Sequence, residues 1–321
     1  PKIQTIDIRK AHLKKQMTQQ FAPKMLSAIT ETLEAGKQVI LFQNRRGYSP
    51  VLSCGTCAYT PNCNACDVSL TYHKWNNQLK CHYCGYTEQV PEFCPSCSAK
   101  DFSDKGFGTE QIEESLKELL PTYVTKRMDY DTTRGKNAHQ QIITDFEQGR
   151  IDILVGTQMV TKGLDFDNVA LVGILNADSM LHFPDFRAYE RAFQLMMQVA
   201  GRAGRKGQQG QVLVQTYDEE HEMFGLLKAN DYTSFIRQQV QERKLFSYPP
   251  YNRLIGITLK HKNQRKLDET ATALVDLMRK SFGNRVLGPE YPSISRIRNY
   301  YHKNVLLKIE HEASISEAKS I

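Results

Sequence analysis

The sequence predicts an α/β protein in which helices cover both faces of a parallel sheet. Three observations define this domain and its limits. Short aliphatic runs alternate with stretches of helical periodicity, which is the pattern of buried parallel strands joined by crossover helices. The alternation is interrupted between about Val51 and Lys100 by a cysteine-rich stretch with few aliphatic residues. After Asp218 the pattern changes, which indicates a separate α+β region.

The expected elements of the sheet domain follow in order. KMLSAITETLEA has apolar residues at helical spacing and is closed by Gly36 as a C-cap. We expect Thr109 to N-cap the next helix, which Pro121 ends, and Gly149 to end the helix after it. The helices are therefore placed at 24–35, 109–120 and 136–148, and the buried strands at 38–42, 153–157, 169–175 and 211–217.

The region after Asp218 is expected to form a small α+β domain. A helix is predicted over about 221–245, and SYPPY (247–251) is predicted to be a rigid turn because each proline fixes its φ angle. A strand, a helix and a second strand are expected at 253–261, 265–282 and 304–310. The predicted domains are thus 1–50 with 101–218, an insertion at 51–100, and a C-terminal domain at 219–321 that we expect to be truncated.

Composition allows several domains and argues against a membrane protein. The chain has 321 residues, and no stretch approaches the roughly 18 consecutive apolar residues of a membrane span. No signal-peptide core is present, so we expect a cytoplasmic protein. The net charge of +7 is compatible with nucleic acid binding but does not require it. Because the first residue is Pro1 and not methionine, we expect the chain to be part of a longer one.

All eight cysteines occur in C-x-x-C pairs, which predicts metal binding. A reducing cytoplasm disfavours disulfides, and one C-x-x-C turn presents two sulfurs to one ion. Eight thiolates complete two tetrahedral zinc sites, so His73 and His82 are expected at the surface and not as ligands. The pairs are Cys54/Cys57, Cys63/Cys66, Cys81/Cys84 and Cys94/Cys97.

The four pairs could combine sequentially, in a cross-braced way or nested. The 14 residues between Cys66 and Cys81 are close to ordinary zinc-ribbon spacing, which favours an inner site formed by the two middle pairs. The first and last pairs would then form an outer site that ties both ends of the insertion together. We favour this nested arrangement and expect both zinc ions to be structural, since four thiolates leave no open position.

The most specific stretch is QVAGRAGR (198–205), which has the form Q-x-x-G-R-x-x-R. Arginines three positions apart lie on one helical face and can both point at one phosphate. A guanidinium cannot lose its proton, so it suits the charge of a phosphoryl group in transfer. We predict Arg202 and Arg205 as catalytic residues and Gln198 as a nucleotide contact. A basic helix end before a glycine turn is the alternative.

A second stretch, GTQMVTKGLDFDN (156–168), supports the same interpretation. Gly163 allows a close backbone approach, and Asp165 is placed to meet a ribose or the arginines. Thr157, directly after a predicted strand, could hold a DNA phosphate through its hydroxyl and backbone N–H. Taken alone, Gly-Thr after a strand is common, and Asp165 could be a helix cap. In this order, the two stretches resemble motifs V and VI of superfamily 2 helicases.

Five stretches closely resemble the primosomal replication-restart helicases: ILFQNRRGYSPVLSC, the four cysteine pairs, GFGTEQIEESL, ILVGTQMVTKG and QVAGRAGRKG. RMDYDTTRGK and LFSYPPY are also similar, so the resemblance covers essentially the whole chain. It implies a RecA-like helicase lobe 2 with an inserted two-zinc, all-cysteine module, nested zinc pairing and a C-terminal DNA-binding domain. By the same resemblance, Asn44, Arg45 and Arg46 match motif IV, and Asp131 with Thr132 match the next loop.

The resemblance also implies a function. Members of this family are ATP-dependent 3′→5′ DNA helicases that bind stalled forks and D-loops and restart replication by primosome assembly. It implies two zinc ions, ATP and Mg²⁺ as cofactors, and DNA, single-strand-binding protein and primosome proteins as partners of a monomer. The chain contains no G-x-x-x-x-G-K-[ST] loop and no D-E-x-H box. Because ATP binds between two lobes, we expect this half alone to be inactive in ATP hydrolysis.

Two other functions stay open on these residues. A zinc-ribbon adaptor that binds DNA or a partner protein would carry the cysteines but would need no phosphate-binding loop upstream. A RecG-like or RecQ-like motor would share motif VI, although four C-x-x-C pairs inside lobe 2 are not expected there. The stretch ISRIRNYYHK (294–303) interleaves basic and aromatic residues, so we predict DNA contacts by Arg296 and Arg298. An exposed polar loop is the alternative.

Overall fold

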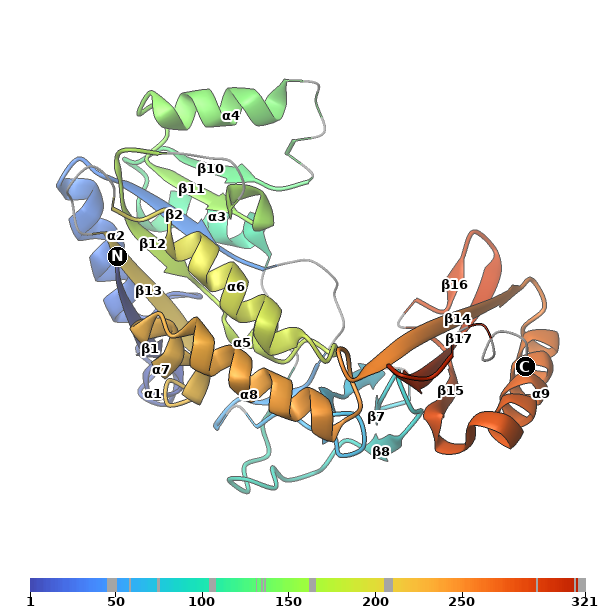
Figure 1. The fold of residues 1–321 in the computed structure, drawn as a ribbon. Helices are drawn as coiled ribbons and strands as arrows, with labels where there is room; N and C mark the ends of the chain where they lie inside the picture. The colour runs from blue at the N-terminus through green and yellow to red at the C-terminus, as the bar shows by residue number, and fades with distance from the viewer. Residues whose placement is uncertain are drawn as a thin grey trace.

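The computed structural model describes residues 1–44, 51–57, 59–73, 76–103, 108–130, 132–133, 135, 137–161, 166–204, 210–292, 294–314 and 316. A sheet domain, a small cysteine-rich insertion and a C-terminal domain are distinguished in Figure 1, with the insertion lying between the other two. Within these residues, no helix is long and apolar enough to cross a membrane.

The sheet domain is built on six parallel strands, which confirms the predicted α/β class. The strand order is β1-β13-β12-β2-β11-β10. Strands β1 and β10 were not predicted, because both lie at an edge of the sheet and their sequences, KIQTID and TKRM, consist mostly of polar residues. The strands are β1 (Lys2–Asp7), β2 (Gln38–Phe42), β10 (Thr125–Met128), β11 (Ile153–Gly156), β12 (Val169–Ile174) and β13 (Gln211–Thr216).

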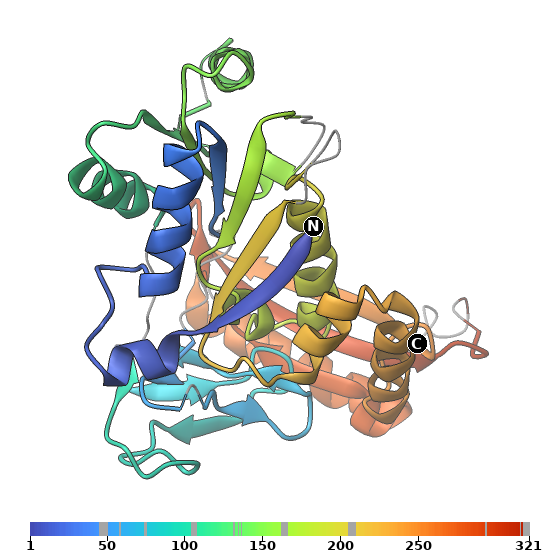
Figure 2. The same ribbon diagram turned by 90° about the vertical axis from the view of Figure 1, so that its left-hand side faces the viewer.

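Helices cover both faces of this sheet, as Figures 1 and 2 show. Strand β2 illustrates why, because its residues are all buried and alternate between two cores. Val39 and Leu41 join the core under α1 (Ile8–Leu13), α2 (Pro23–Glu34) and α3 (Thr109–Leu119). Ile40 and Phe42 join the core under the opposite helices. These are α4 (Ala138–Glu147), α5 (Asp178–Leu181), α6 (Ala188–Ala200) and α7 (Glu222–Ala229).

Two details of the predicted helices were wrong. Thr109 is not the N-cap of α3: Gly108 is, and the Thr109 hydroxyl instead donates to Asp129 Oδ2 at 2.6 Å. The single helix expected at 221–245 is two helices, α7 and α8 (Tyr232–Leu245). Asn230 ends α7 in the left-handed conformation at φ 55°, and Asp231 caps α8 by accepting from the Ser234 N–H.

The break lets α8 pack on the sheet domain. Phe235 of α8 is 2% exposed and stacks on Phe193 of α6, with ring centroids 4.3 Å apart. Both rings belong to the core that includes Phe42. The helical segment after Asp218 therefore begins against the sheet domain, and α8 then runs towards the C-terminal domain in Figure 1.

The insertion consists of short antiparallel pairs around a small core of its own. Leu70 and Leu79 are fully buried there together with three cysteines. Its first and last strands pair with each other, which closes the insertion at its base. The strands are β3 (Ser53–Cys54), β4 (Asn62–Cys63), β5 (Val68–Ser69), β6 (Thr71–His73), β7 (Gln78–Lys80), β8 (Thr87–Gln89) and β9 (Phe102–Ser103).

The C-terminal domain is an antiparallel sheet in the order β14-β17-β15, with a short strand β16 paired to β17. Helix α9 (Gln264–Phe282) buries Val275 against Val305 and Leu307 of β17. The strands and α9 confirm the predicted α+β pattern, although β17 begins earlier than the expected 304. The strands are β14 (Asn252–His261), β15 (Val286–Glu290), β16 (Arg296–Ile297) and β17 (Tyr300–Glu310).

Candidate functional site

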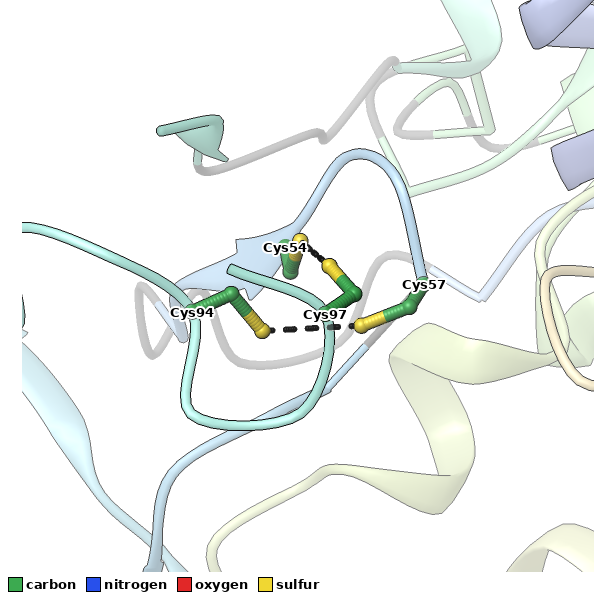
Figure 3. Close-up of side chains that lie close together, drawn as sticks. All are labelled: Cys54, Cys57, Cys94 and Cys97. Atoms are coloured by element: carbon green, nitrogen blue, oxygen red, sulfur yellow. Dashed lines mark hydrogen bonds between the residues drawn. The ribbon is translucent and has the colours of Figure 1, made fainter. Parts of the chain in front are cut away.

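The first and last cysteine pairs meet at the base of the insertion. Figure 3 shows their four sulfurs pointing towards one another. The Cys54 and Cys97 sulfurs are 3.6 Å apart, and those of Cys57 and Cys94 are 3.5 Å apart. A tetrahedral zinc with Zn–S bonds of about 2.3 Å would place its sulfurs about 3.8 Å apart. This outer cluster therefore has the spacing of a zinc site.

The two middle pairs form an inner cluster. Cys63, Cys66 and Cys81 are buried and Cys84 is half-buried, and all four sulfurs lie within 4.8 Å of one another. The sulfurs of Cys63 and Cys84 are 3.6 Å apart. The cysteines are thus grouped in the nested way that the sequence favoured, and none of them forms a disulfide.

The turns around the cysteines explain how such short segments present two sulfurs. The residue after the second cysteine of a pair has a positive φ in three cases: Asp67 (49°), Gly85 (87°) and Ser98 (60°). This left-handed residue reverses the chain directly behind the sulfurs. The Tyr86 N–H also points at the Cys84 sulfur, at 3.5 Å. Such backbone donors stabilise thiolates that bind a metal.

The chemistry of the inner cluster fits a divalent cation. The pKa of the Cys66 thiol is raised, first by its hydrogen bonds to Cys63 and Cys81 and then by burial. Four thiolates crowded into such a space repel one another, so the deprotonated state needs a positive charge at its centre. Zinc supplies that charge and prefers four soft sulfur ligands. Four sulfurs leave no open coordination position, so the arrangement suits structure and not catalysis.

The two histidines of the insertion do not lie freely at the surface, contrary to the sequence prediction. Their Nε2 atoms are 3.3 Å apart, and His82 Nδ1 lies 2.7 Å from the Tyr291 carbonyl oxygen of the C-terminal domain. Burial is the main cause that lowers the pKa of His82 to about 4. His82 therefore contacts the C-terminal domain and His73 contacts His82, and the four cysteines do not require either histidine as a ligand.

Motif V begins at the carboxyl edge of the sheet. Thr157 directly follows β11, is 8% exposed, and its N–H donates to the Met128 carbonyl oxygen at 3.4 Å. Gly156 is required before it, because a Cβ there would lie 2.2 Å from Val160 Cγ1. Gly163 and Asp165 lie outside the described residues.

Motif VI lies at the opposite edge of the sheet. Helix α6 ends at Ala200, Gly201 caps it, and the Gly204 N–H donates to the carbonyl oxygen of Val169, the first residue of β12. Gln198 is exposed in the last turn of α6, and Arg202 follows half-buried. Arg205 lies outside the described residues. Thr157, directly after β11, and Asn168, directly before β12, therefore lie at opposite edges of the sheet.

Motif IV and the next loop share the carboxyl edge with Thr157. Asn44 follows β2, and Arg45, Arg46 and Asp131 lie outside the described residues. Thr132 is held by Asp129, whose Oδ1 accepts from the Thr132 N–H at 3.0 Å. Asp129, which also accepts from the Thr109 hydroxyl, was not predicted as a functional residue. Its signal in the sequence is its place in RMDYDTTRGK, one of the stretches that resemble the family.

The basic and aromatic stretch of the C-terminal domain forms a hairpin. Arg298 and Asn299 both have positive φ, at 48° and 66°, which is the geometry of a tight two-residue turn. Arg296 is exposed and lies 5.1 Å over the Tyr301 ring, and two lysine ammonium groups lie 5.5 and 5.9 Å from the Tyr300 ring. The stretch thus presents rings and cations together, which ordered side chains can offer to bases and phosphates.

Three family models match the chain in sequence order. They are described as the PriA DNA helicase Cys-rich region (63–89), the helicase conserved C-terminal domain (85–207) and the primosomal protein N C-terminal domain (244–321). The second match covers the helices and strands from α3 to α6. The fold and these matches define the class: a helicase C-terminal lobe with a zinc-ribbon insertion.

Curated relatives identify the family more closely. Replication restart protein PriA of Bacillus subtilis is 41% identical over 318 residues, which are 98% of this chain and 39% of that protein. The protein of the same name from Synechocystis sp. is 41% identical over 314 residues, 96% of this chain and 38% of that protein. The chain belongs to the PriA family of replication restart proteins.

The chain spans about two fifths of the length of these relatives. Among solved structures, the helicase Lhr of Mycobacterium smegmatis bound to ssDNA and AMP-PNP has a TM-score of 0.34 and 15% identity, covering 64% of this chain and 19% of that chain.

Proposed function

We propose that the full-length protein is an ATP-dependent 3′→5′ DNA helicase that recognises stalled forks and D-loops and restarts replication by primosome assembly. This chain supplies its second motor lobe, a two-zinc module and a DNA-binding C-terminal domain. The observation that carries the proposal is the position of two motif anchors on one sheet, Thr157 at the carboxyl edge of β11 and Arg202 beside the amino end of β12. In this proposal, the stretch of chain from Thr157 to Arg202 connects a residue that contacts DNA to a residue that contacts the nucleotide.

The residues of the motor face have separate roles in this proposal. Arg202 and Arg205 approach the γ-phosphate from across the cleft between lobes and stabilise the charge of phosphoryl transfer. Arginine fingers of this kind contribute roughly 10³–10⁵ in rate. Gly163, Asp165 and Gln198 contact the nucleotide, with Mg²⁺ held by the first lobe. Because the Thr157 N–H already points at Met128, its hydroxyl is the group that contacts a DNA phosphate.

Zinc binds in both clusters and holds the insertion together. The apolar core of the insertion is small, and a structural zinc supplies roughly 10–16 kcal/mol of apparent folding free energy. The outer ion is held by Cys54, Cys57, Cys94 and Cys97, and the inner ion by Cys63, Cys66, Cys81 and Cys84.

Partners follow from the family and from the C-terminal hairpin. Arg296 and Arg298 contact phosphates, and Tyr300 offers a ring on which a base can stack. Single-strand-binding protein and primosome proteins are the proposed protein partners of a monomer in the cytoplasm.

The test is DNA-stimulated ATP hydrolysis by the full-length protein on forked DNA. Arg205→Ala should lower turnover about 10³-fold or more. The control is Arg265→Ala, because the Arg265 side chain is 89% exposed and pairs with Glu269 on the surface of α9. The present chain alone should be silent. Turnover that survives in Arg205→Ala, or a full-length protein that DNA does not stimulate, would overturn the motor assignment in favour of a zinc-ribbon adaptor.

A further inference from the structure

Tyr248 connects the inner cysteine cluster to the C-terminal half of the chain. It lies in the turn between α8 and β14 and is 2% exposed. Its hydroxyl donates to the Cys66 carbonyl oxygen at 2.6 Å, across 182 positions of sequence. Cys66 is a predicted zinc ligand, so this hydrogen bond ends on the backbone of the inner site itself.

The Tyr248 ring also contacts the sheet domain. It stacks on Phe186, which precedes α6, with centroids 4.4 Å apart and planes inclined by 11°. The edge of Tyr83, from the inner zinc turn, approaches the same ring at 6.5 Å. Arg243 of α8 supports this arrangement, because its guanidinium donates to the Pro249 carbonyl oxygen and pairs with Glu190 of α6. Three parts of the molecule therefore meet at one tyrosine.

Lys308 of β17 brings a positive charge to the same place. Its side chain is nearly buried, and its ammonium lies 4.0 Å from the Tyr248 ring and donates to the Phe246 carbonyl oxygen at 2.7 Å. Within the described part of the chain, no carboxylate forms an ion pair with it. Burial lowers the pKa of Lys308, whereas the inner thiolates, first that of Cys66, raise it. A zinc with four thiolates carries a net charge of −2, so Lys308 is suited to balance it.

A second set of contacts joins the inner cluster to β15. The Lys80 ammonium, one residue before Cys81, is 2.5 Å from Glu290 Oε2. Gly85, directly after Cys84, approaches Glu290 so closely that a Cβ would lie 2.2 Å from its Oε1. His82, between these two, contacts the Tyr291 carbonyl oxygen. The Cys81/Cys84 turn of the inner cluster thus lies against the C-terminal domain.

The outer cluster is attached differently. Among the residues described, the hydrogen bonds of its turns stay inside the insertion, such as Gly55 N–H to the Asp101 carbonyl oxygen and Ser98 N–H to that of Cys94. Cys97 is exposed. The outer cluster closes the base of the insertion, while the inner cluster faces two other domains.

We propose that the zinc-loaded inner cluster is the surface on which the C-terminal domain docks. Tyr248 is the positioning residue that links this site to the sheet domain, and Lys308 of β17 holds Tyr248 from the side of the C-terminal domain. The outer zinc has no such role. The inference does not depend on ATP hydrolysis or DNA binding, so it can fail or hold independently of the proposed motor function.

The experiment measures zinc release and backbone protection in the zinc-loaded protein, without nucleotide or DNA. Release to a colorimetric chelator should show two phases, which Cys84→Ser and Cys97→Ser assign to the inner and outer sites. Tyr248→Phe keeps the ring and removes one buried hydrogen bond, so the inner phase should become about tenfold faster, while the outer phase is unchanged. Hydrogen exchange in β17, measured by mass spectrometry, should rise in the same variant.

The control is Tyr86→Phe, which removes a hydroxyl that donates to Glu88 at the surface of the same module. It should change neither phase. Lys308→Met should act like Tyr248→Phe, because it removes the charge and keeps the apolar stem. Cys97→Ser should leave β17 protected, and Cys84→Ser should not. The proposal is overturned if Tyr248→Phe alters neither phase, accelerates both equally, or leaves exchange in β17 unchanged.

Discussion

The glycine before Thr157 tests how tightly the start of motif V is held. A Cβ at Gly156 would lie 2.2 Å from Val160 Cγ1 and 3.0 Å from the Met128 carbonyl oxygen. Val160 is 1% exposed and β-branched, so neither contact atom can withdraw at low cost. We expect Gly156→Ala to lower the free energy of unfolding by about 1–3 kcal/mol, the usual cost of overpacking a core.

Gly225→Ala is the matched control, because the same methyl group is added where no atom lies within 4 Å. Gly225 is inside α7, where alanine is favoured over glycine by roughly 0.5–1 kcal/mol. Urea unfolding of the zinc-loaded chain, followed by circular dichroism, should give opposite signs for the two substitutions. Adding Val160→Ala to Gly156→Ala should cost less than the sum of the single changes. Wild-type stability of Gly156→Ala, or strict additivity, would refute the steric reasoning.

Three further predictions follow from the sites. Elemental analysis should find two zinc ions in the chain and one in each of the variants Cys84→Ser and Cys97→Ser. Acidification should release zinc, because the thiolates become protonated. A single zinc ion in the unchanged chain would contradict the two-cluster assignment. Burial raises the pKa of Asp178 to about 6, so its contribution to stability is complete below about pH 4 and is lost as the pH rises through 6. The free energy of unfolding should therefore fall by up to about 1.4 kcal/mol per pH unit over this range, and Asp178→Asn should remove that fall. An Asp178→Asn variant with the same dependence of unfolding free energy on pH as the unchanged chain would contradict this prediction. Arg296→Ala and Arg298→Ala should each weaken DNA binding and reduce the slope of the logarithm of the binding constant against the logarithm of the salt concentration by about 1. Fluorescence anisotropy at several salt concentrations measures this slope. An unchanged slope in both variants would show that the hairpin does not contact phosphates.

The sequence alone determined the features that local spacing encodes. The strands at 38–42, 153–156, 169–174 and 211–216 were predictable because both faces of each are buried, so their aliphatic runs are continuous. The nested grouping of the cysteines was favoured because the 14 residues between Cys66 and Cys81 are close to the usual spacing in a zinc ribbon. The family was recognisable because its motifs are contiguous stretches.

Only the tertiary structure decided which distant residues meet. The contact between Tyr248 and Cys66 joins residues 182 positions apart, and no local pattern predicts it. Thr157 and Arg202 lie at opposite edges of the sheet because Thr157 follows β11, whereas α6 runs back to the amino end of β12. Helix α7 ends at Asn230, and this break allows Phe235 of α8 to pack on Phe193. Such contacts form because burying an apolar or polar side chain is favourable only against a complementary surface, and that surface exists only after folding.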